Sequence, residues 1–269
     1  MKAFLRWVGS KAKLLPAIRE WLPPMFNRYH EPFVGSGALY FDLAPRDAVL
    51  SDANNRLTVT YGAIQRDVDT VLTPLRVYAE MYTKHGAPFY YHVRDKIDPD
   101  TMENPELAAW FIFMNRTGFN GVYRVNASGD YNVPAGKFAN PPTVCDEALL
   151  RAAAEALAPA IIVNSDFRAT EERAQPGDLV YLDPPYVPTS ESADFTTYTK
   201  GGFGLAQQTA LRDMAVRLKR KGVHVLLSNS DTSRVRELYA GFELRQIQRA
   251  GSVNSDGEKR QKVTELLIR

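Results

Sequence analysis

The amino-acid sequence predicts an α/β fold in which a mostly parallel sheet is interrupted by a second, mainly helical domain. At both ends of the 269-residue chain, short apolar runs alternate with amphipathic stretches, a pattern typical of strands and covering helices. Between about residues 57 and 146 the pattern changes to helix-like stretches and an aromatic segment rich in Gly and Asn. We therefore expect one α/β domain in two parts, residues 1–56 and 147–269, with residues 57–146 inserted between them.

The individual elements follow from local composition. The expected strands are His30–Val34, Ala48–Ser51, Ala160–Asn164, Leu179–Leu182, Val223–Ser228 and Val263–Ile268. Helices are expected at Ala38–Leu43 and Leu205–Arg220. The last strand follows a basic segment, residues 249–262, and should pair antiparallel as a terminal hairpin strand. A β-hairpin is also expected within the inserted domain.

Composition limits the classes of function. The formal net charge of +2 is too small to indicate a polyanionic partner, so a nucleic-acid surface would need local clusters of Lys and Arg. The single cysteine, Cys145, excludes an intramolecular disulfide and a thiolate-ligated zinc site, and the four histidines show no metal-ligand spacing. No apolar run approaches the roughly 20 residues that a membrane span needs. We expect a cytoplasmic protein without a metal or a membrane segment.

The tetrapeptide Asp183-Pro184-Pro185-Tyr186 follows the predicted buried strand Leu179–Leu182. Open α/β sheets place their ligands outside the carboxyl ends of the strands, so chemistry is expected here. Two prolines fix φ and remove N–H donors, which leaves the Asp183 carboxylate and the Pro184 carbonyl as rigid acceptors. Tyr186 supplies a flat face for stacking.

Two fixed acceptors suit a planar amino group, which offers two hydrogens. The lone pair of an amine conjugated to a ring is delocalised, and two acceptors favour the pyramidal geometry that frees it for in-line attack on a methylsulfonium. The alternative interpretation is a proline-stiffened strand exit with a buried Tyr186.

A glycine turn, Gly35-Ser36-Gly37, joins the first predicted strand to a helix and lets the backbone approach a ligand. The third glycine of a dinucleotide fingerprint is absent, so plain loop geometry is an alternative. Asp52, at the end of the next strand, stands where a ribose-binding carboxylate belongs in a nucleotide-type fold. Together the two features make a nucleotide-like cofactor as reasonable an interpretation as a plain loop.

Six segments carry a resemblance to a known family. They are Phe4–Lys11, Glu31–Gly37, Ser51–Asn54, Met114–Gly121, Asp183–Tyr186 and Lys262–Leu267. Over essentially its whole length the chain resembles the Dam family of DNA adenine N6-methyltransferases, and the order of its motifs is similar to the α-group arrangement. The resemblance implies a Rossmann-like methyltransferase fold, with a catalytic domain in two parts (1–56 and 147–269) and an inserted target-recognition domain (57–146).

The resemblance also implies S-adenosylmethionine as methyl donor, S-adenosylhomocysteine as product, and no metal. The cofactor site would be lined by Trp7, Lys11, Phe33, Gly35, Ser36, Gly37, Asp52, Asp166, Phe167 and Asp183, and the catalytic pocket would be Asp183, Pro184, Pro185 and Tyr186. Asp52 would bind the ribose hydroxyls, and Asp166 and Phe167 the adenine of the cofactor. Alternatives are Trp7 as a packing anchor, and Asp166 and Phe167 as a helix N-cap beside a core phenylalanine.

The segment from Asn115 to Asn126 combines arginines, amides and aromatic side chains, which suits DNA. Arg pairs bidentately with guanine, Asn with a base edge, and an exposed aromatic side chain can enter the stack that a flipped adenine leaves. The resemblance implies DNA contacts from Arg6, Arg116, Phe119, Asn120, Val122, Arg124, Asn126, Pro134 and Lys137. Taken alone, the segment is also compatible with a Gly-rich turn that carries solvated arginines and a core phenylalanine.

The expected activity is methylation of adenine N6 in double-stranded DNA, within GATC, by flipping the target base into the pocket at Asp183. N4 methylation of cytosine and methylation of a protein amide use the same chemistry and stay open, although an aspartate at position 183 favours a nucleobase. A nucleic-acid-binding protein that retains the fold without activity is a third alternative. We expect a monomer that acts on nucleoid DNA in the cytoplasm.

Two further segments have supporting roles by resemblance. Phe195–Tyr198 would close near the flipped base, or form an ordinary aromatic loop. Arg249, Lys259, Arg260 and Lys262 would touch phosphates, or form a solvated surface.

Overall fold

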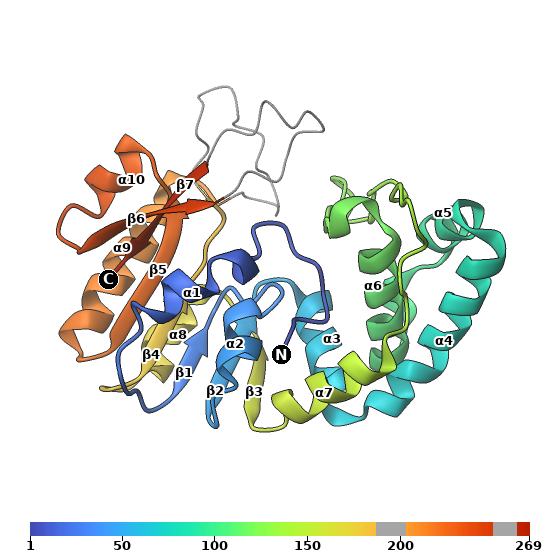
Figure 1. Ribbon diagram of the computed structural model, residues 1–269, viewed down its shortest axis with the longest axis horizontal. Helices are drawn as coiled ribbons and strands as arrows, with labels where there is room; N and C mark the ends of the chain where they lie inside the picture. Colours follow the sequence, from blue (N-terminus) through green and yellow to red (C-terminus); the bar gives the residue numbers. More distant parts are fainter. Residues whose placement is uncertain (187–202, 250–262) are drawn as a thin grey trace. The chain divides into compact units, whose positions relative to one another are not determined.

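The computed structural model describes residues 1–186, 203–249 and 263–269 (Figure 1). The strands are β1 (Tyr29–Glu31), β2 (Ala48–Asp52), β3 (Ala160–Asn164), β4 (Leu179–Leu182), β5 (His224–Ser230), β6 (Leu244–Arg249) and β7 (Val263–Ile268). The α-helices are α1 (Leu15–Arg19), α2 (Ala38–Leu43), α3 (Asn55–Arg66), α4 (Val68–His85), α5 (Ala87–Lys96), α6 (Asn104–Thr117), α7 (Glu147–Leu157), α8 (Thr170–Arg173), α9 (Leu205–Arg220) and α10 (Ser233–Leu238). The 3₁₀-helices are η1 (Lys11–Lys13), η2 (Pro99–Thr101), η3 (Phe119–Gly121) and η4 (Phe167–Ala169).

The strands form one seven-stranded sheet in the order β3-β2-β1-β4-β5-β7-β6. β1 pairs in parallel with β2 and with β4, and β4 pairs in parallel with β5. β7 runs antiparallel to both β5 and β6. The predicted fold class, a mostly parallel Rossmann-like sheet with an antiparallel terminal strand, is confirmed.

Several element bounds were predicted correctly from the sequence, including those of α2, α9, β3, β4 and β7. The predicted strand His30–Val34 is wrong in its bounds, because β1 already ends at Glu31. The next residue, Pro32, has no N–H with which to continue a ladder. The strand predicted at Val223–Ser228 lies at His224–Ser230, and β2 extends one residue beyond its prediction to include Asp52.

The chain divides into two compact units, each described here by itself. The first contains Met1–Ser10, Gly35–Arg46 and Ser51–Asn164, and the second contains Lys11–Val34, Asp47–Leu50 and Ser165–Arg269. The predicted inserted domain, residues 57–146, falls wholly within the first unit. Its bounds stay a prediction.

The core of the second unit forms where α9 and α10 pack on β4, β5 and β7 (Figure 1). Along β4 all four residues are buried, as expected for a strand covered on both faces. Leu211, Met214 and Leu218 recur at helical spacing on one face of α9 and are buried in this core. Each such side chain contributes about 1.5–3 kcal/mol by burial. The strand ends are thereby held in fixed positions.

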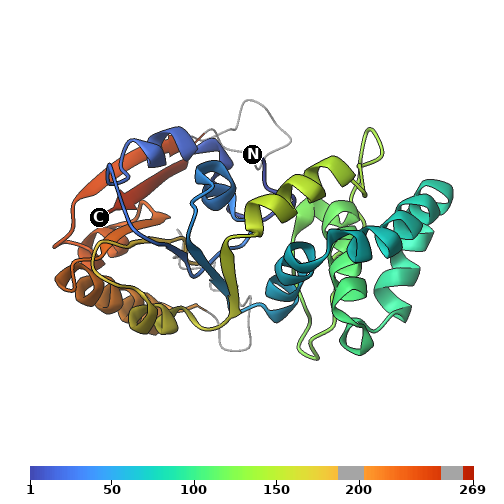
Figure 2. The same ribbon diagram turned by 90° about the horizontal axis from the view of Figure 1, so that it is seen from below.

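The core of the first unit is helical. Figure 2 shows α4, α5 and α6 side by side, and α6 is buried almost all round, with Trp110 and Phe113 fully enclosed. After α6 the chain forms two arms that are linked by antiparallel bridges, Gly118 to Ala135 and Val125 to Tyr131. The expected β-hairpin is therefore present as two isolated bridges.

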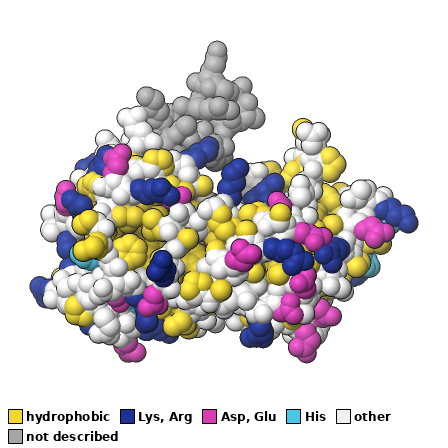
Figure 3. Space-filling model, turned by 60° about the horizontal axis from the view of Figure 1, so that its bottom comes forward, with side chains coloured by type: hydrophobic (Ala, Val, Ile, Leu, Met, Phe, Trp, Pro, Cys, Tyr) yellow, Lys and Arg dark blue, Asp and Glu magenta, His cyan; other side chains and the backbone are white. Residues whose placement is uncertain are grey.

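Charged side chains of both signs are mixed on the face drawn in Figure 3, rather than gathered by sign. Many form exposed ion pairs, such as Arg76 with Glu147 at 2.6 Å and Arg151 with Asp69 at 2.5 Å. Exposed pairs of this kind contribute about 0–1 kcal/mol each. Among the described residues, no helix combines the length and the apolar character that crossing a membrane requires.

A buried hydrogen bond joins β1 to the turn before β4. His30 Nε2 lies 2.9 Å from Asp178 Oδ2, and both side chains are buried. Burial lowers the pKa of His30 below its usual value, although the Asp178 carboxylate opposes this effect. Burial raises the pKa of Asp178, but hydrogen bonds from the Gln175 backbone and from His30 outweigh it and leave that pKa lowered.

We predict that stability falls as the pH drops below about 6.5, the ordinary pKa of histidine. The folded pKa of His30 is depressed, so the unfolded chain binds the proton first and is favoured as the pH falls. Thermal unfolding at pH 7.5 and 5.5 should give a smaller difference in Tm for His30→Gln than for the wild type. A change of 1 kcal/mol corresponds to about 2–4 °C in a chain of this size. His92→Gln, at an exposed histidine, is the control; an equal effect of both variants would exclude His30 as the source.

Candidate active site

Asp183 follows the last residue of β4 and is held by two donors of the second unit. Lys11 Nζ lies 2.7 Å from Asp183 Oδ1 and 2.9 Å from Oδ2. Ser228 Oγ donates to Oδ1 at 2.7 Å. The Asp183 side chain is 20% exposed whereas that of Lys11 is 3% exposed, so a buried cation fixes a partly accessible carboxylate. Pro184, the next residue, is buried.

The Tyr186 side chain has two specific contacts, one at its hydroxyl group and one on a face of its ring. Its hydroxyl donates to Glu265 Oε2 at 2.5 Å, and the Lys11 ammonium lies 4.6 Å from its ring centroid. Burial, together with Asp183 and Glu265, raises the pKa of Tyr186 well above its usual value. The phenol therefore stays protonated and serves as a donor to Glu265.

A third contact holds the proline turn. Gln208 Nε2 on α9 donates to the Pro185 carbonyl at 2.8 Å, and Asn229 Nδ2 on β5 donates to Gln208 Oε1 at 3.1 Å. Both amides are buried. The Asp183–Tyr186 segment is thus fixed by side chains from η1, α9, β5 and β7.

Sequence reasoning missed Ser228, Glu265 and Gln208. Ser228 could have been found, because Leu182 pairs with Leu227 and the residues that follow these two must be neighbours. Glu265 is the charged residue of a mostly apolar strand, Val263–Ile268, and it is 1% exposed; a buried charge is a signal for a specific partner. Nothing in the local sequence of α9 distinguishes Gln208 from a surface glutamine.

An aromatic cluster also lies in the second unit. The Phe33 and Phe167 rings are stacked at 5.4 Å, and Phe203 approaches both at 5.6 and 5.7 Å. Asp166 caps η4 by accepting a hydrogen bond from the Arg168 backbone, and its carboxylate pairs with the Arg168 guanidinium. The alternative of an N-cap beside a core phenylalanine is thus present, since Phe167 is 4% exposed. A ligand role for both residues stays a prediction.

The predicted glycine turn and Asp52 meet in the first unit. Asp52 Oδ2 accepts a hydrogen bond from Gly35 N at 3.2 Å, and Oδ1 accepts one from Asn54 N at 3.0 Å. Burial raises the pKa of Asp52 to about 6, although these backbone hydrogen bonds oppose the shift. Ser36 Oγ donates to Ser10 Oγ at 3.2 Å. The Asp52 carboxylate at the end of β2 is thus held by two backbone hydrogen bonds, and its raised pKa lies close to neutral pH.

Gly35 and Gly37 are required by conformation and by close packing. Both have positive φ, 45° and 63°, which is costly for other residues. A Cβ on Gly35 would lie 2.7 Å from the Trp7 ring, and one on Gly37 would lie 3.0 Å from the Tyr61 hydroxyl. Trp7 also stacks with Tyr123 at 6.3 Å. Trp7 is therefore a packing anchor for the glycine turn, and its contact with a cofactor stays a prediction.

Arg6 and the end of α6 are tied together in the first unit. Arg6 N donates to Asn115 Oδ1 at 2.9 Å, and Asn115 Nδ2 donates to Arg6 O at 2.7 Å. A Cβ on Gly121 would lie only 2.4 Å from the Arg6 Cβ, so the close packing of Arg6 requires a glycine there. Burial and the neighbouring Arg6 lower the pKa of Arg116, whose buried Nε has no hydrogen-bond partner among the described residues. Two guanidinium groups are thus held close together.

The two arms after α6 carry most of the predicted DNA contacts. Arg124 donates from Nε to Asn132 Oδ1 at 2.7 Å and from Nη2 to Asn132 O at 3.1 Å. The Asn126 side chain closes the turn by accepting hydrogen bonds from the backbone of Ser128 and Asp130, both at 2.9 Å. The structure assigns Asn126 a turn-forming role, while contact with DNA stays a prediction.

Phe119 is 49% exposed, which is unusual for a large aromatic side chain, and it follows the helix that carries Arg116. Asn120 has a positive φ of 52°. Pro134 accepts a hydrogen bond from Phe119 N at 2.9 Å through its carbonyl. The remaining predicted contacts, Val122 and Lys137, are half-buried and exposed, respectively. The alternative prediction, that Phe119 is a core residue of a Gly-rich turn, is therefore wrong.

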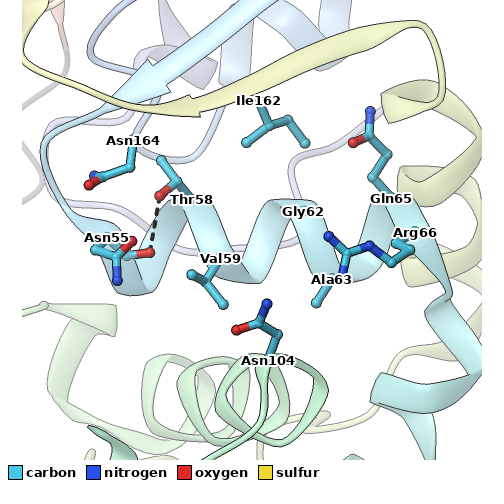
Figure 4. Close-up of a pocket in the computed structure, with 10 residues that line it drawn as sticks. All are labelled: Asn55, Thr58, Val59, Gly62, Ala63, Gln65, Arg66, Asn104, Ile162 and Asn164. Carbon is cyan, nitrogen blue, oxygen red and sulfur yellow. Dashed lines mark hydrogen bonds between the residues drawn. The ribbon is translucent and has the colours of Figure 1, made fainter.

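A hollow of about 450 Å³ lies within the first unit (Figure 4). α3, the start of α6 and β3 line it, and Gly62 leaves its centre open on α3. Asn164 in its wall donates to the Asp52 carbonyl at 2.9 Å. None of the predicted site residues lines this hollow.

Some predicted residues lie outside the described ones. They are Phe195–Tyr198, the side chain of Arg249, and Lys259, Arg260 and Lys262. Within the described ranges, no group of three or more His, Cys, Asp or Glu side chains is arranged to hold a metal ion.

Comparison with known proteins matches this arrangement to one family. A family model described as D12 class N6 adenine-specific DNA methyltransferase matches residues 7–252. The chain is 37% identical to the type II methyltransferase M1.LlaDCHI of Lactococcus lactis subsp. cremoris, with 100% of this chain and 95% of that protein covered. It is 34% identical to the type II methyltransferase M.MjaIII of Methanocaldococcus jannaschii, with 100% and 98% covered. It is also 34% identical to the DNA adenine methylase of Haemophilus influenzae, with 99% and 92% covered.

These matches extend over nearly the whole length of both partners, and they confirm the resemblance to DNA adenine methylases expected from the motifs. The Asp183–Tyr186 segment and the glycine turn both lie within the matched range. The chain belongs to the D12 class of N6 adenine-specific DNA methyltransferases, and it is a DNA-modifying enzyme.

Proposed function

We propose that this enzyme transfers a methyl group from S-adenosylmethionine to N6 of an adenine that is flipped out of double-stranded DNA, within the sequence GATC. The observation that carries the proposal is the Asp183 carboxylate, which Lys11 and Ser228 fix at the end of β4 beside the Tyr186 ring. An adenine amino group inside a duplex is paired and stacked, so the base must leave the helix to reach such a pocket.

Within the pocket, an Asp183 oxygen and the Pro184 carbonyl accept the two hydrogens of the amino group. Tyr186 presents its ring to the base, and its hydroxyl contact with Glu265 holds the far end of the ring in place. When bound, S-adenosylmethionine supplies a methyl group that its positively charged sulfur activates. The N6 lone pair forms the bond to the methyl carbon as the C–S bond breaks, and the C–S electron pair stays on sulfur. The negative charge of Asp183 stabilises the cationic N6, and Asp183 accepts the proton that N6 releases.

Asp52 fits a role as the ribose-binding group. A carboxylate has about four lone-pair sites, and the two hydrogen bonds from Gly35 N and Asn54 N leave capacity for ribose hydroxyls. We assign Trp7, Ser36 and Gly37 to the same ligand by their place in this cluster. Further cofactor contacts are assigned to Phe33, Asp166 and Phe167 of the second unit.

Sequence specificity is assigned to the arms after α6. The two contacts of Arg124 with Asn132 use Nε and one Nη2 hydrogen, and they set the direction of the guanidinium. Its remaining N–H groups suit guanine O6 and N7. We assign Arg6, Asn120, Val122 and Asn126 to the same surface, and Arg116, Pro134 and Lys137 to its margins. The exposed Phe119 ring suits the space that a flipped adenine leaves in the stack.

The test of this proposal is methyl transfer from labelled S-adenosylmethionine to two duplexes that differ only in a GATC site. Label is expected in the GATC duplex alone, and the labelled base should be N6-methyladenine. Label in neither duplex would contradict the enzyme activity. Equal label in both would contradict only the sequence specificity.

Asp183→Ala should lower kcat by about 10²–10³-fold, because one acceptor and the charge beside N6 are lost. Since this change leaves Lys11 buried without that partner, Asp183→Asn is the second variant. The asparagine amide keeps one acceptor oxygen but lacks the negative charge. The Asp183→Asn variant should therefore also have a kcat below that of the wild type. Asp213→Ala, at a surface aspartate paired with its neighbour Arg212, is the control. Wild-type turnover by either Asp183 variant would exclude the mechanism.

The affinity for S-adenosylmethionine should weaken as the pH falls through about 6, the raised pKa of Asp52. The ionised carboxylate is the stronger acceptor of hydroxyl hydrogen bonds, and protonation turns one of its oxygens into a donor, so the affinity is highest above this pKa and falls progressively below it. Calorimetric titration without DNA, between pH 5 and 8, measures the effect. Asp52→Asn should bind weakly and without this pH dependence. If the affinity of Asp52→Asn for S-adenosylmethionine showed the same pH dependence as the wild type, a group other than Asp52 would be responsible for it.

Arg124→Ala should relax sequence preference, because a bidentate contact with guanine contributes about 1–3 kcal/mol of discrimination. Lys137→Ala should instead weaken binding to all duplexes alike and flatten the salt dependence. Dissociation constants for GATC and for single-mismatch duplexes, measured at several salt concentrations, separate the two effects. A loss of equal size on matched and mismatched duplexes would count against Arg124 as a reader of base identity.

A further inference from the structure

Lys11, which the sequence resemblance assigned to the cofactor site, contacts the proposed adenine pocket. Its ammonium reaches both oxygens of Asp183 and lies over the Tyr186 ring. We propose that Lys11 is a positioning residue of the adenine pocket, which orients Asp183 so that Oδ2 accepts the target amino group. This inference rests on the proposed function of Asp183.

The hydrogen bonds of Asp183 distinguish its two oxygens. Oδ1 accepts a hydrogen bond from Ser228 Oγ at 2.7 Å and also lies 2.7 Å from the Lys11 ammonium, its ion-pair partner. Oδ2 accepts from Lys11 Nζ alone among the described residues, at 2.9 Å. Oδ1 thus lies against two donor groups and Oδ2 against one, so Oδ2, with two lone pairs, is the freer acceptor. The target amino group therefore binds Oδ2.

The position of Lys11 also selects a face of Tyr186. The ammonium lies 4.6 Å from the ring centroid, a typical cation–π separation. A base and an ammonium cannot stack on the same face, so the flipped adenine takes the opposite one. One side chain thus constrains both the acceptor and the stacking surface.

Burial makes this arrangement rigid. The Lys11 side chain is 3% exposed, and a buried ammonium keeps its charge only with a specific partner. The backbone holds the residue in place as well, because Leu14 N donates to Lys11 O at 2.8 Å where η1 continues into α1. Lys13 lies on the same short helix with its side chain exposed, which provides a matched lysine for comparison.

The experiment measures two quantities for each variant of the full-length enzyme. They are the single-turnover rate of methyl transfer to duplex DNA and the Kd of S-adenosylmethionine in the absence of DNA. Lys11→Ala should lower the rate by about a hundredfold, as expected when a reacting group loses its orientation. Its Kd for S-adenosylmethionine should be unchanged. Lys13→Ala should change neither quantity.

Two further measurements separate positioning from a purely structural role. Propylammonium added to Lys11→Ala should restore part of the rate without a change in Tm, because it returns a cation to Asp183. Lys11→Arg keeps the charge, but its planar guanidinium can occupy both carboxylate oxygens and block the free site on Oδ2. This variant should fold, bind S-adenosylmethionine normally and remain slow. It also tests the proposal if Lys11→Ala does not fold.

Opposite outcomes would overturn the proposal. A weaker Kd for S-adenosylmethionine with an unchanged transfer rate in Lys11→Ala would make Lys11 a cofactor-binding residue. A wild-type rate in Lys11→Arg would contradict the assignment of Oδ2. Failure of the wild-type enzyme to methylate DNA would instead contradict the proposed function, and it is seen before any variant is compared.

Discussion

The arrangement of the site depends on one buried charge pair, Lys11 with Asp183. A carboxylate at the end of a buried strand is costly unless a cation and a hydrogen-bond donor meet it. Lys11 and Ser228 supply these, from η1 and from β5. The parallel pairing of β4 with β5 brings Ser228 to the same edge of the sheet. The sheet therefore positions the carboxylate to which the proposed function assigns the reaction, and the pair explains why a charged group can be held rigidly there.

The residues that follow Asp183 are also held by specific hydrogen bonds. Tyr186 is held by Glu265, and Pro185 by Gln208. Each contact comes from a different element, so a small shift of α9 or β7 would misplace the acceptors. In the first unit the Trp7 ring packs against the glycine turn and against Tyr123, which is next to Arg124 in the chain. Packed side chains thus support both the proposed catalytic residues and the proposed recognition residues.

The sequence predicted the fold class, the Asp183–Tyr186 motif at a strand end, and the pairing of the glycine turn with Asp52, because each depends on local pattern. Prediction from the sequence failed for side chains whose position depends on contacts between residues that are distant in the chain. Nothing near Lys11 indicates that its partner is 172 residues away, and the resemblance placed it with the cofactor. Glu265 and Gln208 were missed for the same reason. β1 ends early because Pro32 has no N–H to continue the ladder. The prediction considered only the apolar character of His30–Val34 and did not take this into account.

The most direct measurement is nucleotide-resolution mapping of modified bases in DNA from cells that express this chain and lack another adenine methyltransferase. A pocket with two acceptors and a stacking ring should produce N6-methyladenine, in the context GATC. The same cells with Asp183→Asn should contain far less of it. Modified cytosine in place of adenine, or equal modification with the variant, would contradict the role of the Asp183 carboxylate as the acceptor of the adenine amino group.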